Sequence, residues 1–171
     1  MGALSAGCDQ QTGGLAPRRP DPARIKTEPA PPAEKNVIRV YIFAPAEPWV
    51  SFDPEGDPTP GGLRFSLFLE PGGSSKAVYG DGIIEINLYR MVSQRGGKPQ
   101  RELVRTWEFT PEQALPYLLR RPTAYGWAYG MRLSWGDAKL AGQDIQVVPR
   151  FIRRDGQIVP GRPLSLKVPR A

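Results

Sequence analysis

The chain contains no histidine in its 171 residues and one cysteine, Cys8. Histidine is the commonest general base, the commonest ligand of transition metals and the side chain that titrates near neutral pH. A single cysteine can form neither an internal disulfide nor a cysteine-cluster zinc site. The sequence also lacks a glycine-rich phosphate loop and a nucleophile elbow. We therefore expect no metal, no cofactor and no enzymatic activity.

Long hydrophobic runs are also missing, since no stretch approaches the 18 or so apolar residues of a membrane-spanning helix. Proline and glycine are instead abundant, with 20 and 19 copies. Such an excess favours short strands joined by turns over long helices. The length has room for one domain and little more.

The charge is positive, with 23 Lys and Arg against 17 Asp and Glu and a formal net charge of +6. An excess of this size favours anionic surfaces and polymers and carries no information about the fold. Arg150, Arg153 and Arg154 form the densest cluster and are a candidate patch for anionic, phosphate-bearing polymers. The alternative is that they are a solvated hairpin end, where charged side chains are common.

The small residues Ser5, Ala6 and Gly7 before Cys8 resemble the lipobox of bacterial lipoproteins. The resemblance implies that residues 1–8 are the remnant of a signal peptide and that Cys8 carries a lipid anchored in the cell envelope. The sequence departs from the pattern because it has no basic and apolar segments, and Leu4 lies one place too far from the cysteine. If the cysteine is incidental, we expect a cytoplasmic protein instead.

Residues 9–36 are predicted to form a disordered tether. Their only large apolar side chains are Leu15 and Ile25, so little apolar surface can be buried to offset the entropy of ordering. The segment contains six prolines: Pro17, Pro20, Pro22, Pro29, Pro31 and Pro32. It is typical of a semi-rigid spacer, and the folded domain is predicted to cover residues 37–171.

Alternating apolar residues predict short strands along residues 37–171. In residues 37–44 we expect Ile38, Val40 and Ile42 on one face. In residues 63–70 every second side chain is apolar, and Ile84, Ile86 and Leu88 share a face in residues 83–91. Asp155-Gly156 predicts a hairpin turn. Thr110 and Gln113 predict a capping box at the start of one short helix near residues 111–119. The pattern indicates an all-β, antiparallel sandwich of seven to nine short strands.

This layout resembles the immunoglobulin-like and transthyretin-like sandwiches. It is also similar to an uncharacterised group of bacterial envelope proteins that combine a lipobox, a Pro-rich spacer and a small β domain. The resemblance is carried by residues 81–90 (DGIIEINLYR), 107–112 (WEFTPE) and 125–130 (YGWAYG). It implies the fold and the location, and it brings no activity.

Residues 125–135 are the most informative segment. They are predicted to form one strand, and one face of it carries a row of large side chains: Tyr125, Trp127, Tyr129, Met131, Leu133 and Trp135. Trp127, Tyr129 and Trp135 are a candidate platform on which sugar rings could stack. We favour the alternative that they belong to the core, because the small residues opposite them leave that face little to bury.

The function predicted first is a non-catalytic binding or structural module of a cell-envelope lipoprotein, with a protein or polysaccharide partner. A carbohydrate-binding module that uses exposed Trp and Tyr is the first alternative. An intracellular nucleic-acid-binding protein is the second alternative. The positive charge allows it only if the protein is not exported, because an exported domain is not expected to meet nucleic acid. A carboxylate pair such as Glu85 and Glu108 would suit a glycosidase in principle, but no spacing selects it.

Overall fold

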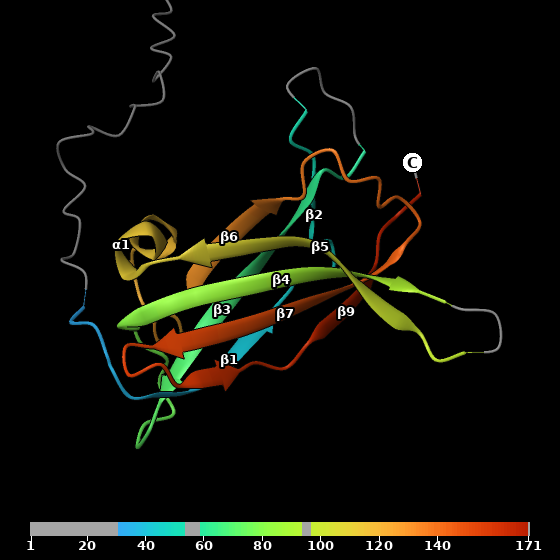
Figure 1. Ribbon diagram of the computed structural model, residues 1–171. Helices are drawn as coiled ribbons and strands as arrows, with labels where there is room; N and C mark the ends of the chain where they lie inside the picture. Colours follow the sequence, from blue (N-terminus) through green and yellow to red (C-terminus); the bar gives the residue numbers. More distant parts are fainter. Residues whose placement is uncertain (1–30, 54–58, 94–96, 171) are drawn as a thin grey trace, which may run out of the picture.

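A computed structural model describes residues 31–53, 59–93 and 97–170, and it shows an all-β sandwich with two antiparallel sheets. Figure 1 shows the sheets as two layers, with the helix at one end of them. Cys8 and residues 9–30, on which the lipid anchor and most of the tether depend, lie outside the described residues. No helix in the described part of the chain has the length and apolar character needed to cross a membrane.

The first layer, which we call the β3 sheet, is built around its central strand. β6 pairs with one edge of β3, and β1 and β2 pair with the other edge at different heights. The four strands are β1 (Val37–Phe43), β2 (Trp49–Val50), β3 (Gly62–Pro71) and β6 (Tyr129–Ser134).

The second layer, the β4 sheet, has the order β5-β4-β7-β8, and β9 lies beside β8 on the same edge of β7. Its strands are β4 (Gly82–Val92), β5 (Gln100–Phe109), β7 (Asp144–Arg153), β8 (Ile158–Pro160) and β9 (Leu164–Lys167). The predicted turn joins β7 to β8, with Gly156 at a positive φ of 83°.

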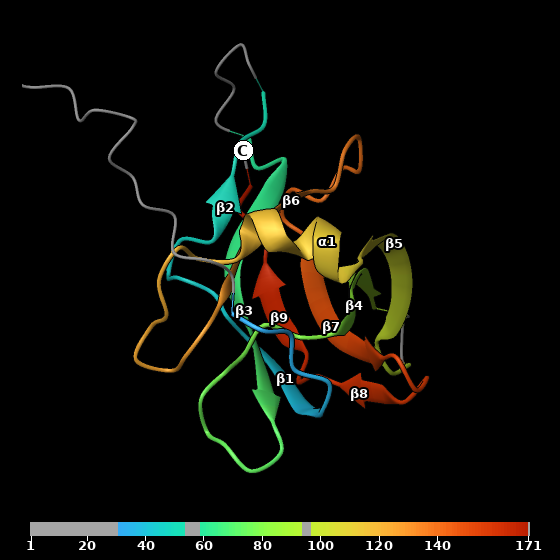
Figure 2. The ribbon, with the colours of Figure 1, turned by 90° about the vertical axis from the view of Figure 1, so that its left-hand side faces the viewer.

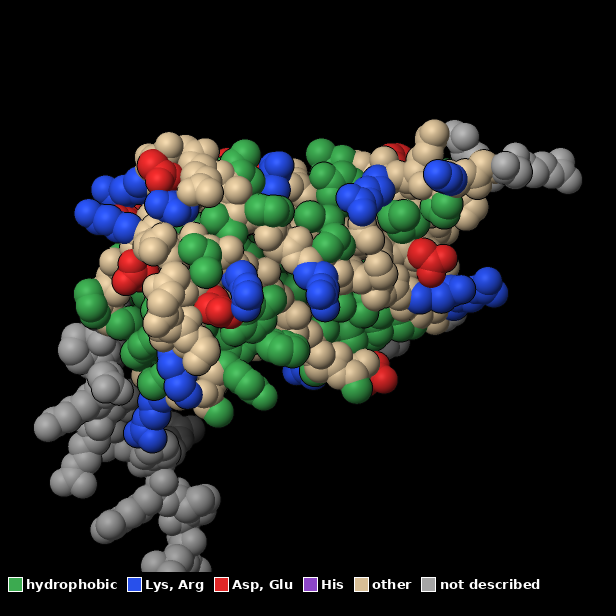
Figure 3. Space-filling view, turned by 90° about the horizontal axis from the view of Figure 1, so that it is seen from below, with side chains coloured by type: hydrophobic (Ala, Val, Ile, Leu, Met, Phe, Trp, Pro, Cys, Tyr) green, Lys and Arg blue, Asp and Glu red, His purple; other side chains and the backbone are tan. Residues whose placement is uncertain are grey.

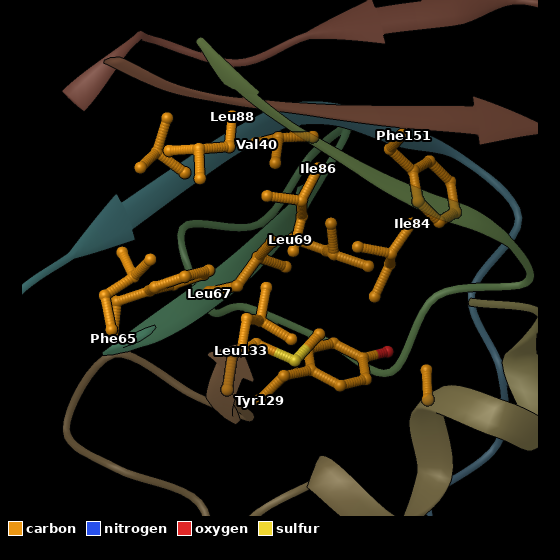
Figure 4. Close-up of a cluster of buried hydrophobic side chains, with 14 of the residues drawn as sticks. Val40, Phe65, Leu67, Leu69, Ile84, Ile86, Leu88, Tyr129, Leu133 and Phe151 are labelled. Atoms are coloured by element: carbon orange, nitrogen blue, oxygen red, sulfur yellow. The ribbon is translucent and has the colours of Figure 1, made fainter. Parts of the chain in front are cut away.

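The core lies between the two sheets, and Figure 4 shows it from within. The alternation predicted for residues 63–70 is confirmed, because the inward side chains of β3 are all buried. The inward side chains of β4 face them. The residues of these two rows are Leu63, Phe65, Leu67, Leu69, Ile84, Ile86 and Leu88.

The short helix is also confirmed. It consists of α1 (Pro111–Ala114) and a 3-10 turn, η2 (Leu115–Tyr117), and it crosses one end of the sandwich (Figure 2). Both hydrogen bonds of the capping box are present: the N–H of Gln113 donates to the hydroxyl of Thr110, and the N–H of Thr110 donates to the side chain of Gln113. The helix ends before the predicted residue 119, because the backbone N–H of Leu119 donates to the carbonyl of Ala128 at 2.9 Å and draws the chain toward β6.

The folded body begins earlier than predicted. The backbone N–H of Glu34 donates to the carbonyl of Tyr79 at 2.7 Å, and the carbonyl of Glu34 accepts from the N–H of Asp81 at 2.8 Å. The carbonyl of Asn36 accepts from Gly72 at 2.9 Å. The backbone contacts of the folded body therefore extend to Glu34, before the predicted boundary at residue 37.

The face predicted for the first strand also needs correction. Residues Ile38, Val40 and Ile42 were expected on one face, but the pairing of β1 with β3 shifts register between Val37 and Arg39. This bulge turns Ile38 outward, where it is 48% exposed, and buries Val37. A bulge inserts one residue and so reverses the alternation beyond it.

Candidate functional site

Two of the three residues of the predicted aromatic platform lie in the core and not on the surface. Tyr129 is 0% and Trp135 is 4% exposed, and both belong to the core between the sheets. The phenol oxygen of Tyr129 accepts a hydrogen bond from the N–H of Gly80 at 3.0 Å, and burial raises the pKa of this phenol far above its ordinary value. Trp127 is only partly buried. The core interpretation is thus confirmed for Tyr129 and Trp135.

The predicted single strand over residues 125–135 is broken at Gly126. Its φ is +101°, and β6 begins only at Tyr129. A Cβ at residue 126 would lie 2.3 Å from the carbonyl oxygen of Ala77, so only glycine fits this conformation and this close approach. The turn sends the side chain of Tyr125 outward, where it is 61% exposed.

Tyr125 joins a group of aromatic side chains on the outer surface of the β3 sheet. We call this group the aromatic cluster, and its members are Tyr41, Phe43, Phe68 and Tyr125. The connection from η2 to β6, which carries Tyr125, passes along the outer side of this sheet (Figure 2). The cluster therefore combines side chains of β1 and β3 with one from a loop.

The rings of the cluster touch one another. Phe68 stacks on Tyr41 with centroids 5.2 Å apart and planes at 6°, and it meets Phe43 edge to face at 5.7 Å. Tyr125 lies 6.2 Å from Phe68 and 6.1 Å from Phe43. Phe68 is 4% exposed although its strand turns it away from the core, while Phe43 is 55% exposed. One buried ring thus supports two open ones.

The register of the strands explains this arrangement. Tyr41 lies opposite Phe68, and Phe43 lies opposite Ser66. These side chains point outward, because they alternate along their strands with the inward aliphatic residues. Adjacent aromatic side chains on one face of a sheet interact favourably across the strands. The small buried residues Ala77 and Ala128 pack with Phe68.

A groove of about 710 Å³ continues from the aromatic cluster along the same face. Its floor is formed by Ser66 and Gly130, which lie opposite each other on β3 and β6. Phe43 and the following residues line one side of it. Arg64 and Arg132, which are also direct cross-strand neighbours, line the other side.

The three arginines of the predicted anion patch all form ion pairs. Each of its three arginines is paired with a carboxylate, at 2.8 Å between Arg153 and Asp155 and 2.6 Å between Arg154 and Asp81. Arg150 pairs with Glu85. Three carboxylates thus match the three guanidinium groups, and this arrangement adds no support to the prediction of an anion patch.

The suggested carboxylate pair is brought together, since Glu85 and Glu108 lie directly opposite each other on β4 and β5. Glu85, however, is held by Arg150 and by the side-chain amide of Asn87. The hydroxyl of Thr106 donates to Asn87 at 2.6 Å and extends the network. Glu85 thus has the contacts of a structural side chain that orders the outer face of the β4 sheet.

A second groove, of about 660 Å³, lies where the edge of β1 approaches the connection between β8 and β9. Figure 3 shows the molecule from below, where apolar, basic and acidic side chains are interspersed. Arg39 at this groove pairs with Glu70, with 3.3 Å between Nη1 and Oε1. The charge of Arg39 is thus matched, while Arg162 also lines this groove.

In the described part of the chain, no three His, Cys, Asp or Glu side chains come together as a metal site would require. Comparison of the chain with protein-family models, with curated proteins and with solved structures finds no match. The candidate site is therefore the aromatic cluster with its adjoining groove, and its identification depends on geometry alone.

Proposed function

We propose that this domain is a non-catalytic binding module that contacts a polysaccharide through the aromatic cluster. The observation that carries the proposal is the exposure of Phe43 and Tyr125, at 55% and 61%, on top of a ring that is itself buried. Phe68 holds both rings in place, so their order is already established before a ligand arrives. Preorganised contact surfaces lose less freedom on binding.

The shape of the cluster favours a narrow ligand. The open rings present flat apolar surface, and the charged pair Arg39–Glu70 and the exposed Lys76 lie nearby on β1, β3 and the following turn. A stable protein interface buries about 800 Å² on each partner around a broad apolar centre. A chain of sugar rings needs only a row of aromatic faces, because each ring can stack on one of them.

The absence of histidine and the engagement of Glu85 by Arg150 and Asn87 support a non-catalytic role. A glycosidase needs two carboxyl groups free to act on one bond, one as acid and one as base or nucleophile. Here one of the two opposed carboxylates is committed to a guanidinium. The outer face of the β4 sheet therefore supports the fold.

We further propose that the module is held at the cell envelope, which the lipobox-like segment before Cys8 supports. If Cys8 of the full-length precursor is lipidated in a bacterial host, Cys8→Ser transfers the protein from the membrane fraction to the soluble fraction. Identical fractionation of the two forms would remove the anchored location and leave the binding function standing.

The binding function is tested by affinity electrophoresis in native gels that contain a soluble polysaccharide. The gels run toward the cathode, because the sequence pI is about 9.7. Neutral probes are a mixed-linkage β-glucan, xylan and galactomannan, and acidic probes are polygalacturonate and alginate. We expect at least one of these to retard the protein.

Phe43→Ala and Tyr125→Ala should each abolish most of the retardation without unfolding the domain. Leu103→Ala is the matched control, because Leu103 is a 54% exposed apolar side chain on β5 in the other sheet. Mobility unchanged by every polysaccharide, or equal retardation of all three variants, would contradict the proposed function.

A further inference from the structure

Two arginines on the outer surface of the β3 sheet form a pair of like charges. Arg64 and Arg132 lie directly opposite each other on β3 and β6. Like charges at opposite positions of a sheet destabilise it. Strands usually place an acidic side chain there, as the chain itself does with Arg90 and Glu102 on β4 and β5.

No carboxylate neutralises this pair within residues 31–53, 59–93 and 97–170. Nη2 of Arg64 donates to the backbone carbonyl of Glu47 at 3.3 Å. The guanidinium of Arg132 lies 5.9 Å from the ring centroid of Phe52, a cation–π contact. Each guanidinium has five N–H donors, so the described part of the chain leaves most donors of the pair without an acceptor.

The groove beside the arginines is kept open by small residues. Ser66 and Gly130 form its floor, and a Cβ at residue 130 would already lie 3.3 Å from Cδ2 of Leu119. Phe43 borders the same groove and also belongs to the aromatic cluster. A ligand stacked on Phe43 therefore reaches the two guanidinium groups without leaving the surface.

We propose that this groove binds the carboxylate groups of an acidic polysaccharide, with Arg64 and Arg132 as the recognising residues. The inference rests on the proposed function and adds the ligand class to it. Each guanidinium group presents parallel N–H donors that match the two oxygens of a carboxylate. A bound carboxylate also removes the repulsion between the two arginines, which the folded protein otherwise tolerates.

The test uses polygalacturonate and its fully methyl-esterified form, which share one backbone and differ in charge. The full chain should bind polygalacturonate at least about tenfold more tightly than the ester, since hydrogen bonds to charged groups are the stronger ones. The preference should shrink as salt is added, because exposed charges are screened. Alginate and its methyl ester repeat the comparison on a second backbone.

The double variant Arg64→Gln/Arg132→Gln should lose the preference for the acid form. Arg101→Gln/Lys167→Gln is the charge-matched control, because it removes the same two charges from β5 and β9 of the other sheet. The control should bind both acidic polymers as the unaltered protein does. This comparison separates recognition at the groove from the general attraction of a basic protein to a polyanion.

Three outcomes overturn the inference. Equal binding of acid and ester forms would do so while leaving the proposed function intact, because the aromatic cluster would still bind sugar rings. Equal loss in the double variant and its control would show that only net charge matters. Tighter binding of a single-stranded oligonucleotide than of any polysaccharide, abolished by Phe43→Ala, would assign the surface to base stacking and would overturn the proposed function too.

Discussion

Phe68 is the residue on which the aromatic cluster depends, and Phe68→Ala tests that dependence. The side chain is 4% exposed and contacts three rings, at centroid distances of 5.2, 5.7 and 6.2 Å. Truncation of a buried phenylalanine costs about 3–5 kcal/mol. We expect the lower end, about 3 kcal/mol, because the space left behind opens toward solvent and the neighbouring rings can close over it.

A loss of this size lowers the melting temperature by about 6–12 °C for a chain of this length, at about 2–4 °C per kcal/mol. Phe43→Ala removes a ring that is 55% exposed, and should cost about 1 kcal/mol or less, because little apolar area returns to water. Urea unfolding followed by tryptophan fluorescence measures both values, and the slope with urea should not change.

Phe68→Leu is the control that keeps the fold. It retains an apolar side chain beneath the cluster but removes the stacked ring, so stability should fall by less than in Phe68→Ala while polysaccharide retardation still weakens. If Phe68→Ala costs no more than Phe43→Ala, Phe68 does not support the other rings. The cluster would then not be a preorganised surface.

Three further predictions concern other features. Arg132→Gln should stabilise the domain by about 0.2–1 kcal/mol, because it removes a like-charge pair, and a lower urea midpoint would contradict this. Tyr129→Phe leaves the N–H of Gly80 without its acceptor, which costs about 1–3 kcal/mol. Burial raises the pKa of Tyr129 in the folded protein, so the folded protein keeps a proton that the unfolded chain loses above about pH 10. The free energy of unfolding therefore falls above that pH by about 1.4 kcal/mol per pH unit. Between about pH 9 and about pH 11 this fall should be smaller in Tyr129→Phe than in the unaltered protein. Thr110→Ala removes the side-chain cap of α1 and should cost about 1 kcal/mol by urea unfolding.

The parts of the fold that were predictable from sequence are those determined by neighbouring residues. The inward rows of β3 and β4 repeat every second residue over a whole strand, and the capping box places its two partners three residues apart. The turn at Gly156 needs only a short Asp-Gly motif. Each of these signals is complete within one element, and here the pairing with other strands agrees with it.

The candidate site could not be predicted because its residues come together only through pairing. Tyr41 and Phe43 share the outward face of β1, but nothing local places them beside Phe68. A usable signal was present in residues 63–70, where Phe68 is a large aromatic at a position that should face solvent. A large aromatic residue on an otherwise polar strand face indicates a contact on the outer surface of the sheet, whereas a row of aromatics at every second residue is typical of the core.

The prediction of one strand over residues 125–135 failed because of a single glycine, Gly126. The alternation of large and small residues continues unbroken through Gly126, so periodicity predicts one long strand. The positive φ at Gly126 and the close approach of Gly126 to Ala77 exclude residues 125 and 126 from the strand. A glycine inside a strand pattern thus marked a turn with a close backbone approach.

Because Tyr125 is carried by a loop and the other three rings by strands, the surface divides into a constant and an exchangeable part. The backbone of residues 123–128 is fastened to the body through Ala77, whose N–H donates to Tyr125 and whose carbonyl accepts from Trp127. These two hydrogen bonds join backbone atoms only, so they can form with any side chain at residue 125. Libraries randomised at residues 124 and 125 alone, with Gly126 retained, should therefore yield folded domains with altered ligand preference, and the sandwich becomes a scaffold for selecting new binders.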